Sequence, residues 1–201
     1  MIYLSMKQCT IIIPPLGIDP KMGEKMTQSW LEKYSIKSIN WGIFWQESDD
    51  DYETRLKLLI NEIDKLNKQD FEVSLIGLSA GGSVAINAFS QRKNQIKNLI
   101  NICGRLYVGK IKFPESKKIN DNNFLFKESV KKCEENIKIL TVDDKKKILT
   151  IRPVWDEFAS TEFATIDGVS NIKVFSIEHV LTILLSMTVY KSKIIGFLNK
   201  K

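Results

Sequence analysis

Histidine and cysteine are scarce in this sequence, and their scarcity excludes several kinds of site. The 201 residues include one histidine, His179, and three cysteines, Cys9, Cys103 and Cys133. An odd number of cysteines without CxxC spacing does not fit a disulfide framework or a zinc-finger pattern. A single histidine also excludes a metal site built from several imidazoles. We therefore expect no metal and no other cofactor.

The sequence also lacks a long apolar run and a recognisable secretion signal. Its most apolar late segment, Val180 to Tyr190, is too short to cross a bilayer as a helix, which takes about 20 residues. The first residues lack the basic start and the small-residue cleavage site of a signal peptide. These absences, together with the cysteine pattern, favour a reduced, cytoplasmic setting without a membrane span.

Basic segments interleaved with aromatic residues and arginine are absent as well. The formal net charge is +6, but the basic residues are mostly lysines spread among acids. The one compact run, Lys145 to Lys147, follows Asp143 and Asp144. It is typical of the solvent-exposed start of a strand rather than of a phosphate-binding patch. We therefore expect no nucleic-acid partner. The length of 201 residues is typical of a single domain, residues 1–201.

The sequence does contain a regular alternation of strand and helix patterns. Short β-branched and apolar runs predict strands, and apolar residues at helical spacing predict helices between them. The predicted strands are Thr10–Ile13, Ser38–Trp45, Glu72–Ile76, Leu99–Cys103, Ile148–Ile151 and Ile172–Ile177. The predicted helices are Pro20–Lys33, a segment opened by Ser48–Asp51 that continues to Leu66, Gly81–Arg92, Phe124–Ile139 and Val180–Leu198. Nearly continuous apolar strands indicate an α/β fold in three layers, with a mostly parallel sheet of about six strands and helices on both faces.

One segment interrupts this alternation. Residues 104–141 are too many for a simple crossover between two strands. Phe113 to Asn123 is polar and loop-like, whereas Phe124 to Ile139 has a helical pattern. We interpret the segment either as a small cap insertion or as a long crossover that contains one surface helix.

The most informative motif is Gly77-Leu78-Ser79-Ala80-Gly81, which fits the pattern G-x-S-x-G. It lies where a predicted strand ends and a predicted helix begins. A serine on such a tight turn has its hydroxyl exposed above the strand ends, and small neighbours allow strand and helix to approach closely. The alternative is a glycine-rich turn in which the serine only caps the helix.

Two further residue types follow this motif at strand ends. Asp156 follows the predicted strand Ile148–Ile151, and His179 follows the predicted strand Ile172–Ile177. Ligand sites of open α/β sheets form at the carboxyl ends of strands, where Ser79, Asp156 and His179 would all lie. This order and placement resemble the α/β-hydrolase family over essentially the whole chain. The sequence differs from that family in its small size and in lacking most of the antiparallel N-terminal strands.

The resemblance implies a catalytic triad, with Ser79 as nucleophile, His179 as base and Asp156 as the carboxylate that orients the imidazole. A serine hydroxyl needs a base to remove its proton, and an imidazole can return that proton to the leaving group. Glu157 is an alternative to Asp156 because it is adjacent in the loop. Glu178, adjacent to His179, is expected to point away from the ring.

The resemblance also implies an oxyanion hole formed by two backbone N–H groups. Ala80, the residue after the nucleophile, is one predicted donor. The second donor belongs to the loop after the first strand, where Pro14 and Pro15 have no N–H, so Leu16, or else Gly17, is predicted.

Several apolar residues follow predicted strand ends and are candidates for an acyl pocket. We predict substrate contacts from Leu16, Met22, Leu106, Tyr107 and Trp155. Ordinary core packing is the alternative explanation for each of them. Cys103 ends the fourth predicted strand near the same edge and is either an inert half-buried thiol or a second nucleophile.

The function that the resemblance implies is a serine hydrolase acting on a small-molecule ester or thioester through an acyl-serine intermediate. The same residues could transfer the acyl group to an acceptor other than water. A third interpretation is an inactive hydrolase-like scaffold that only binds its ligand, which the reduced N-terminus and the atypical oxyanion loop favour.

Overall fold

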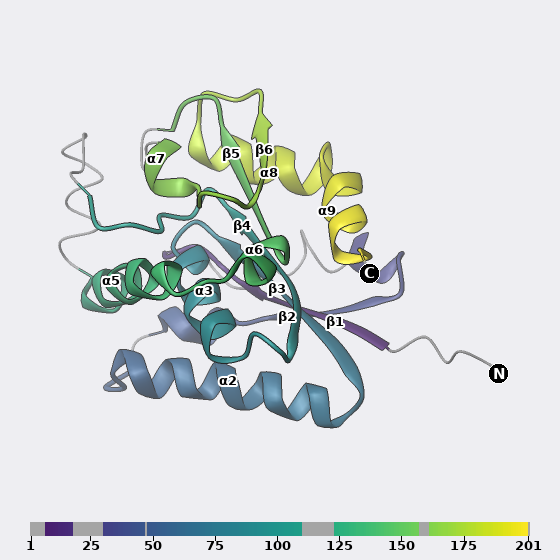
Figure 1. Cartoon of the computed structure of the whole chain (residues 1–201), viewed down its shortest axis with the longest axis vertical. Helices are drawn as coiled ribbons and strands as arrows, with labels where there is room; N and C mark the ends of the chain where they lie inside the picture. Colours follow the sequence, from purple (N-terminus) through teal and green to yellow (C-terminus); the bar gives the residue numbers. More distant parts are fainter. Residues whose placement is uncertain (1–6, 18–29, 47, 110–122, 157–160, 201) are drawn as a thin grey trace.

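One six-stranded sheet forms the centre of the computed structural model, which describes residues 7–17, 30–46, 48–109, 123–156 and 161–200 (Figure 1). The strand order is β2-β1-β3-β4-β5-β6, every neighbouring pair is parallel, and β2 and β6 form the two edges. The strands are β1 (Lys7–Ile13), β2 (Ile36–Asn40), β3 (Phe71–Leu78), β4 (Ile96–Ile102), β5 (Ile148–Pro153) and β6 (Ser170–Val174). The predicted α/β fold with a mostly parallel sheet is confirmed.

Helices cover both faces of the sheet, so the domain has three layers (Figure 1). One face is covered by α2 (Tyr52–Lys68), α3 (Gly81–Gln91) and α5 (Phe124–Lys138). The other face is covered by α8 (His179–Thr188) and α9 (Lys191–Leu198). Shorter helices connect these elements: η1 (Gly42–Trp45), α6 (Val142–Lys146) and α7 (Thr161–Ala164).

Alternate residues of the strands face two separate hydrophobic cores. In β1, Ile11 and Ile13 are buried in one core and Ile12 in the other. In β3, Leu75 and Ile76 are divided in the same way. Because side chains alternate across a strand, a strand covered on both faces is apolar at nearly every position. This explains the continuous apolar runs of the sequence.

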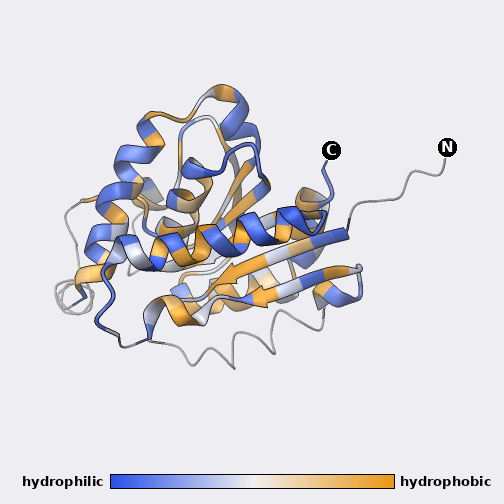
Figure 2. Cartoon of the chain, turned by 90° about the horizontal axis from the view of Figure 1, so that it is seen from below, coloured by the Kyte–Doolittle hydropathy of each residue, from blue (hydrophilic) through white to orange (hydrophobic). Residues whose placement is uncertain are grey.

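The longest of these helices, α2, has one apolar side. Its buried aliphatic side chains recur at helical spacing and are Leu56, Leu59, Ile60, Ile63 and Leu66. Figure 2 shows apolar and polar residues alternating along the helices that flank the strands. Asp51 is the N-cap of this helix, because its carboxylate accepts a hydrogen bond from the N–H of Thr54 at 2.7 Å.

A polar network is buried between α2, α3 and α5. The side-chain amide of Asn87 donates to the Tyr52 hydroxyl and to the Ser129 carbonyl. The hydroxyls of Ser83 and Ser129 lie 2.6 Å apart, and Asn136 donates to Asn87 at 2.9 Å. A buried polar group without a partner costs about 1–3 kcal/mol, so these mutual bonds fix how the three helices pack.

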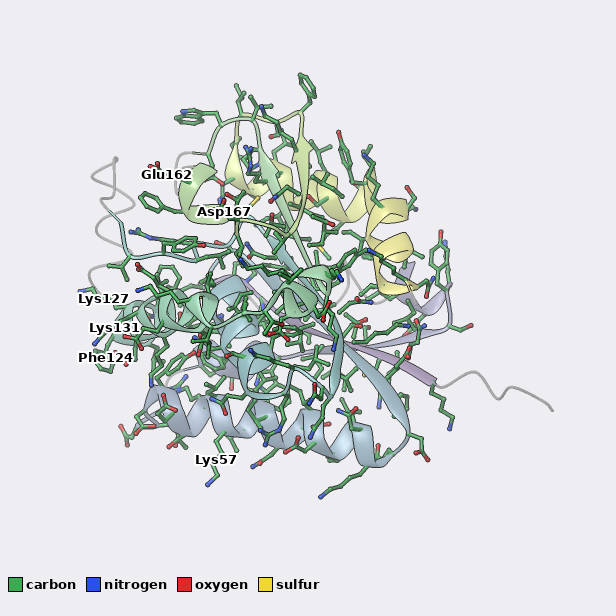
Figure 3. The ribbon with its side chains drawn as sticks, in the orientation of Figure 1. Lys57, Phe124, Lys127, Lys131, Glu162 and Asp167 are labelled. Carbon is green, nitrogen blue, oxygen red and sulfur yellow. The ribbon has the colours of Figure 1, made fainter. Side chains whose placement is uncertain are left out.

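The helix α5 occupies the second half of the long segment between β4 and β5. Its inner side buries Phe126, Val130 and Cys133, whereas Figure 3 shows Phe124 and Lys127 on its outer side. The small cap proposed for residues 104–141 stays a prediction, because residues 110–122 lie outside the described residues.

The second predicted strand, Ser38–Trp45, is wrong at its carboxyl end. The strand β2 ends at Asn40, and the 3₁₀ helix η1 follows. A buried arginine of α2 explains the difference, because Arg55 donates to the carbonyls of Phe44 at 2.7 Å and Gln46 at 2.6 Å. These charge-assisted bonds favour a turn, in which both carbonyls point to one guanidinium.

The predicted helix Val180–Leu198 is two helices rather than one. It begins at His179 and breaks into α8 and α9, which meet at an angle of 65°. At the break, the N–H groups of Val189 and Tyr190 both donate to the carbonyl of Leu185, which ends the regular ladder. None of the described helices is long and apolar enough to cross a membrane alone, although α8 and α9 together reach the required length and composition.

The end of β6 differs from the sequence prediction, and the predicted helix Pro20–Lys33 is only partly described by the structure. The strand β6 ends at Val174 rather than Ile177, because the N–H of Ser176 turns back to the Val174 carbonyl at 2.8 Å. The predicted helix Pro20–Lys33 lies mainly outside the described residues, and its described end at Trp30 is helical and buried.

An ion pair between α2 and the end of α3 contributes pH-dependent stability. The Nε and Nη2 atoms of Arg92 donate to the two carboxylate oxygens of Asp64 at 2.7 and 2.9 Å. These hydrogen bonds hold the pKa of Asp64 below its ordinary value. A lowered folded-state pKa stabilises the fold above the ordinary aspartate pKa, and that contribution is lost as the pH falls through the folded value.

We expect Asp64→Asn to lower the free energy of unfolding by about 1 kcal/mol at pH 7, because the ion pair is lost. Below about pH 4 the deficit should shrink, since the aspartate then loses its charge as well. Urea unfolding at both pH values measures the difference. Asp143→Asn is the control, because Asp143 pairs with Lys146 on an exposed turn and should matter little at either pH. An equal deficit at both pH values for Asp64→Asn would contradict the assignment.

Candidate active site

Ser79 lies in the tight turn between β3 and α3. The strand ends at Leu78 and the helix begins at Gly81, so only two residues form the turn. The backbone of Ser79 is left-handed, with φ at 49°, a conformation that costs about 1–2 kcal/mol for a residue with a side chain. Its N–H still donates to the carbonyl of Ile102 in β4 at 2.9 Å. The chain therefore turns sharply at the serine, as a nucleophile elbow does.

Glycines on both sides of Ser79 allow the helix to approach the sheet. A β-carbon added to Gly77 would lie 2.6 Å from the carbonyl oxygen of Gly81. One added to Gly81 would lie 2.1 Å from the carbonyl oxygen of Ile13, at the end of β1. Both distances are too short for real atoms, so any side chain at these positions would push α3 away from the strands.

Three polar side chains from three strand ends form one hydrogen-bonded chain. His179, the first residue of α8, lies between Ser79 and Asp156, which follows β5. Its Nε2 is 2.8 Å from Ser79 Oγ, and its Nδ1 is 2.9 and 3.1 Å from the two oxygens of Asp156. Because an ionised carboxylate only accepts, Nδ1 carries the proton and Nε2 accepts from the serine hydroxyl. The structure thus brings the three predicted residues together.

The three side chains differ in how far solvent reaches them. His179 is 5% exposed and Asp156 is 8% exposed, whereas Ser79 is half-buried. A buried hydrogen bond between ring and carboxylate is stronger than an exposed one, because water does not compete for it. The ring is therefore held in one orientation while the serine remains more open to solvent.

Glu178 does not compete with Asp156 for the ring. Its carboxylate caps α8 by accepting from the N–H groups of Val180, at 2.9 Å, and Leu181. The cap fixes the first turn of the helix and therefore the position of His179. The other alternative, Glu157, lies outside the described residues.

The predicted oxyanion-hole residues lie in one small apolar cluster. Ala80 precedes α3, Leu16 follows β1, and both pack in the cluster that contains Phe126 of α5. Trp45 fixes the loop after β1, because its Nε1 donates to the carbonyl of Pro14 at 2.8 Å. The role of Trp45 could not be predicted from the sequence, since this bond joins residues that are 31 positions apart.

The remaining residues predicted to contact substrate lie in different settings. Leu106 is fully buried in the core beside α2 and α3, so core packing accounts for it. Tyr107 packs against the same core, and burial raises the pKa of its phenol to about 12. Trp155 is 49% exposed and directly precedes Asp156. Met22 lies outside the described residues.

Exposed apolar side chains gather on the loops that follow β5 and β6. The two loops are joined, because the N–H of Val154 donates to the carbonyls of Val174 and Ser176 at 3.2 and 3.0 Å. We call this surface the apolar rim, and its members are Val154, Trp155, Phe175 and Ile177. Clustered exposed apolar groups often mark a binding surface, and here they flank two residues of the hydrogen-bonded chain.

Cys103 lies closer to these residues than the sequence indicated. It follows β4 with a left-handed backbone, φ 55°, and is 1% exposed. Its Sγ, a nitrogen of His179 and an oxygen of Asp156 all lie within 4.8 Å of one another. Strand prediction placed it near the edge of the sheet, but only the left-handed turn brings its side chain to the imidazole.

Comparison with known proteins finds similarity in structure but not in sequence. No protein-family model and no curated protein sequence matches the chain. The protein Est1E from Butyrivibrio proteoclasticus is 17% identical, with a TM-score of 0.65 over 97% of this chain and 90% of that chain. The meta-cleavage product hydrolase from Pseudomonas fluorescens is 12% identical, with a TM-score of 0.68 over 96% and 90%. A monoacylglycerol lipase from Paleococcus ferrophilus is 12% identical, with a TM-score of 0.61 over 94% and 93%.

These similarities extend over nearly the whole length of both chains in each pair. Together with the six parallel strands and the helices on both faces, they show that the chain has the α/β-hydrolase fold. At such low identity the similarity concerns the fold, and the roles of individual residues follow from their own geometry.

We expect Gly81→Ala to lower the thermal midpoint, because the new methyl group would collide with the Ile13 carbonyl and cost at least about 1–3 kcal/mol. Gly196→Ala is the matched control, since among the described residues no atom beyond its chain neighbours and its own stretch of helix lies within 4 Å of a β-carbon added there. Because Gly196 lies inside α9, alanine should raise stability by about 0.5–1 kcal/mol. Thermal unfolding followed by circular dichroism measures both. If Gly81→Ala is as stable as the wild type, close packing of α3 does not constrain the turn.

Proposed function

We propose that this chain is a serine hydrolase that cleaves an ester or thioester of a small molecule, with Ser79 as the nucleophile. The observation that carries the proposal is the continuous chain of hydrogen bonds from Asp156 through His179 to Ser79. A serine that only caps a helix has no need of a buried imidazole and carboxylate behind it. The fold shared with lipases and esterases supports the same class of reaction.

In the proposed mechanism, Ser79 Oγ attacks the carbonyl carbon of the substrate while Nε2 of His179 takes the hydroxyl proton. When the tetrahedral intermediate collapses, that proton passes to the leaving alcohol or thiol, and Ser79 is acylated. Water then attacks the acyl-serine, giving one proton to His179. The imidazole returns this proton to Ser79 Oγ as the carboxylic acid leaves. In both halves, Asp156 stabilises the charged imidazolium.

Negative charge develops on the carbonyl oxygen of the substrate at each attack. We propose the backbone N–H groups of Ala80 and Leu16 as the donors that stabilise it, helped by the positive end of the α3 dipole. Donors of this kind are effective when they are fixed before the charge forms. The hydrogen bond from Trp45 to Pro14 supports the proposal, because it holds the loop that carries Leu16.

The surroundings of Ser79 favour a small substrate with an apolar acyl or aryl group. The cluster of Leu16, Ala80 and Phe126 lies at the serine turn, and Trp155 is open to solvent beside Asp156. One solved structure of Est1E has ferulic acid bound, and a mutant of the meta-cleavage product hydrolase is complexed with acetates. Ligands of that size agree with the small substrate that we propose here.

We also propose a cytoplasmic location. No disulfide joins Cys9, Cys103 and Cys133, and all three are buried, an arrangement that a reducing compartment preserves. Thiols in a secreted protein would be exposed to oxidising conditions during folding, before burial protects them.

We expect a fluorophosphonate to label the protein once, on the peptide that contains Ser79, because an aligned base activates only that hydroxyl. Ser79→Ala should abolish labelling, as measured by intact-protein mass spectrometry. The matched control is Ser90→Ala, which removes a serine from α3, the helix that follows the Ser79 turn, and should leave labelling unchanged. If folded wild-type protein reacts with neither a small nor a bulky probe, the inactive binding scaffold is the better interpretation.

We expect Asp156→Asn to keep the fold and to lower the turnover of a short-chain ester on the order of 10⁴-fold, as in a protease analogue, because the imidazole loses its orienting carboxylate. Asp167→Asn is the control, since Asp167 is exposed near α7 and outside the hydrogen-bonded chain (Figure 3). Initial rates and circular dichroism measure the two effects. Near-wild-type turnover in Asp156→Asn would instead assign to Glu157 the role of the carboxylate that orients the imidazole.

A further inference from the structure

The carboxyl ends of β3 and β4 carry two similar turns. The N–H of Ser79 donates to the carbonyl of Ile102 in β4, and the N–H of Cys103 donates to the carbonyl of Ile151 in β5. Both Ser79 and Cys103 have left-handed backbones. The second turn brings the Cys103 thiol within 4.8 Å of a nitrogen of His179 and an oxygen of Asp156. The proposed hydrolysis uses the ring and the carboxylate but has no role for the thiol.

The three donor atoms match the ligand types of zinc-like cations. Zn²⁺ binds thiolate sulfur at about 2.3 Å and imidazole nitrogen or carboxylate oxygen at about 2.0–2.2 Å, so tetrahedral ligand atoms are roughly 3.3–3.6 Å apart. In the structure Nδ1 of His179 lies 2.9 Å from an oxygen of Asp156, and one donor atom from each of the three residues lies within 4.8 Å of the other two. Shifts of about 1 Å would give metal-ligand geometry.

We propose that Cys103, Asp156 and His179 form a binding site for a thiophilic divalent cation, Zn²⁺ or Cd²⁺, and that its occupancy blocks the reaction reversibly. The block rests on the proposed function, because an imidazole that binds the cation through Nδ1 carries its proton on Nε2 and cannot take the Ser79 proton. Binding itself does not depend on that function. A water molecule completes the four ligands, because Ser79 Oγ lies on the Nε2 side of the ring.

Binding exchanges one proton for the metal. The Cys103 thiol releases its proton to solvent and its sulfur bonds to the cation, which loses coordinated water. The proton of the neutral His179 ring moves from Nδ1 to Nε2, so that Nδ1 supplies a lone pair, and Asp156 supplies a carboxylate oxygen. The two anionic ligands balance the two positive charges of the ion. The fourth ligand is uncharged, so the buried site carries no net charge.

The other two cysteines provide matched controls. Burial raises the pKa of the Cys9 thiol to about 11 and that of Cys133 well above its ordinary range. Among the described residues, the group of Cys103, Asp156 and His179 is the one set of three such donors close enough to share an ion. Neither of the other thiols is therefore expected to bind the cation.

Titration with Co²⁺ tests binding directly, because coordination by a thiolate produces a sulfur-to-metal charge-transfer absorption band. We expect the band in the wild type and in Cys133→Ala. In Cys103→Ala the band should disappear and the affinity should fall by about 100-fold or more. Cys103→Gly is a second variant, since glycine adopts the left-handed backbone without strain and keeps the fold. A wild type without the band, or a band that survives in both Cys103 variants, would overturn the site.

Labelling of Ser79 by a fluorophosphonate then tests the block. Zn²⁺ should slow labelling of the wild type, and a chelator should restore it, whereas the same Zn²⁺ concentration should leave the labelling rate of Cys103→Gly at that variant's own metal-free value. A Co²⁺ band without any labelling of metal-free protein would leave the metal site standing and refute the hydrolase. Labelling that Zn²⁺ slows equally in wild type and Cys103→Gly would leave the hydrolase standing and refute the site.

Discussion

The close approach of α3 to the ends of β1 and β3 constrains everything around Ser79. Gly77 and Gly81 lie so near to neighbouring backbone that neither position has room for a side chain. The helix therefore begins directly after the strand, and Ser79 takes the left-handed conformation that joins them. Because all strands of a parallel sheet end at one edge, the loops after β5 and β6 bring Asp156 and His179 to the same place. The geometry of the candidate site follows from packing between one helix and the sheet.

The packing of α3 on the sheet holds the Ser79 turn in place only if the helix keeps its position. Apolar contacts alone tolerate small shifts of a helix. The hydrogen bonds of Ser83 and Asn87 to α2 and α5 are directional. A displacement of α3 would leave several buried amides and hydroxyls without partners, at about 1–3 kcal/mol for each group. The polar network beneath the helix therefore fixes the serine turn, although no member of the network contacts the reacting atoms.

Patterns that depend on near neighbours were predictable from the sequence. Apolar runs located the strands, and the order of serine, aspartate and histidine after strand ends located the side chains that the structure brings together. Features set by distant residues were not predictable. The helix η1 depends on Arg55 and the fixed loop on Trp45, which reach across the fold. Neither glycine nor proline marks the break between α8 and α9 at residues 189–190, and Cys103 reaches the imidazole only through a left-handed turn.

The strand β6 forms one edge of the sheet and is five residues long. Its residues Ser170, Asn171 and Lys173 are exposed and polar. An open strand edge is a template on which another chain can pair, and a short edge that carries a lysine discourages such pairing. The apolar rim begins directly after this strand, at Phe175. The molecule therefore exposes apolar groups beside its candidate site, while the short polar edge next to them discourages copies of the chain from pairing into a growing sheet.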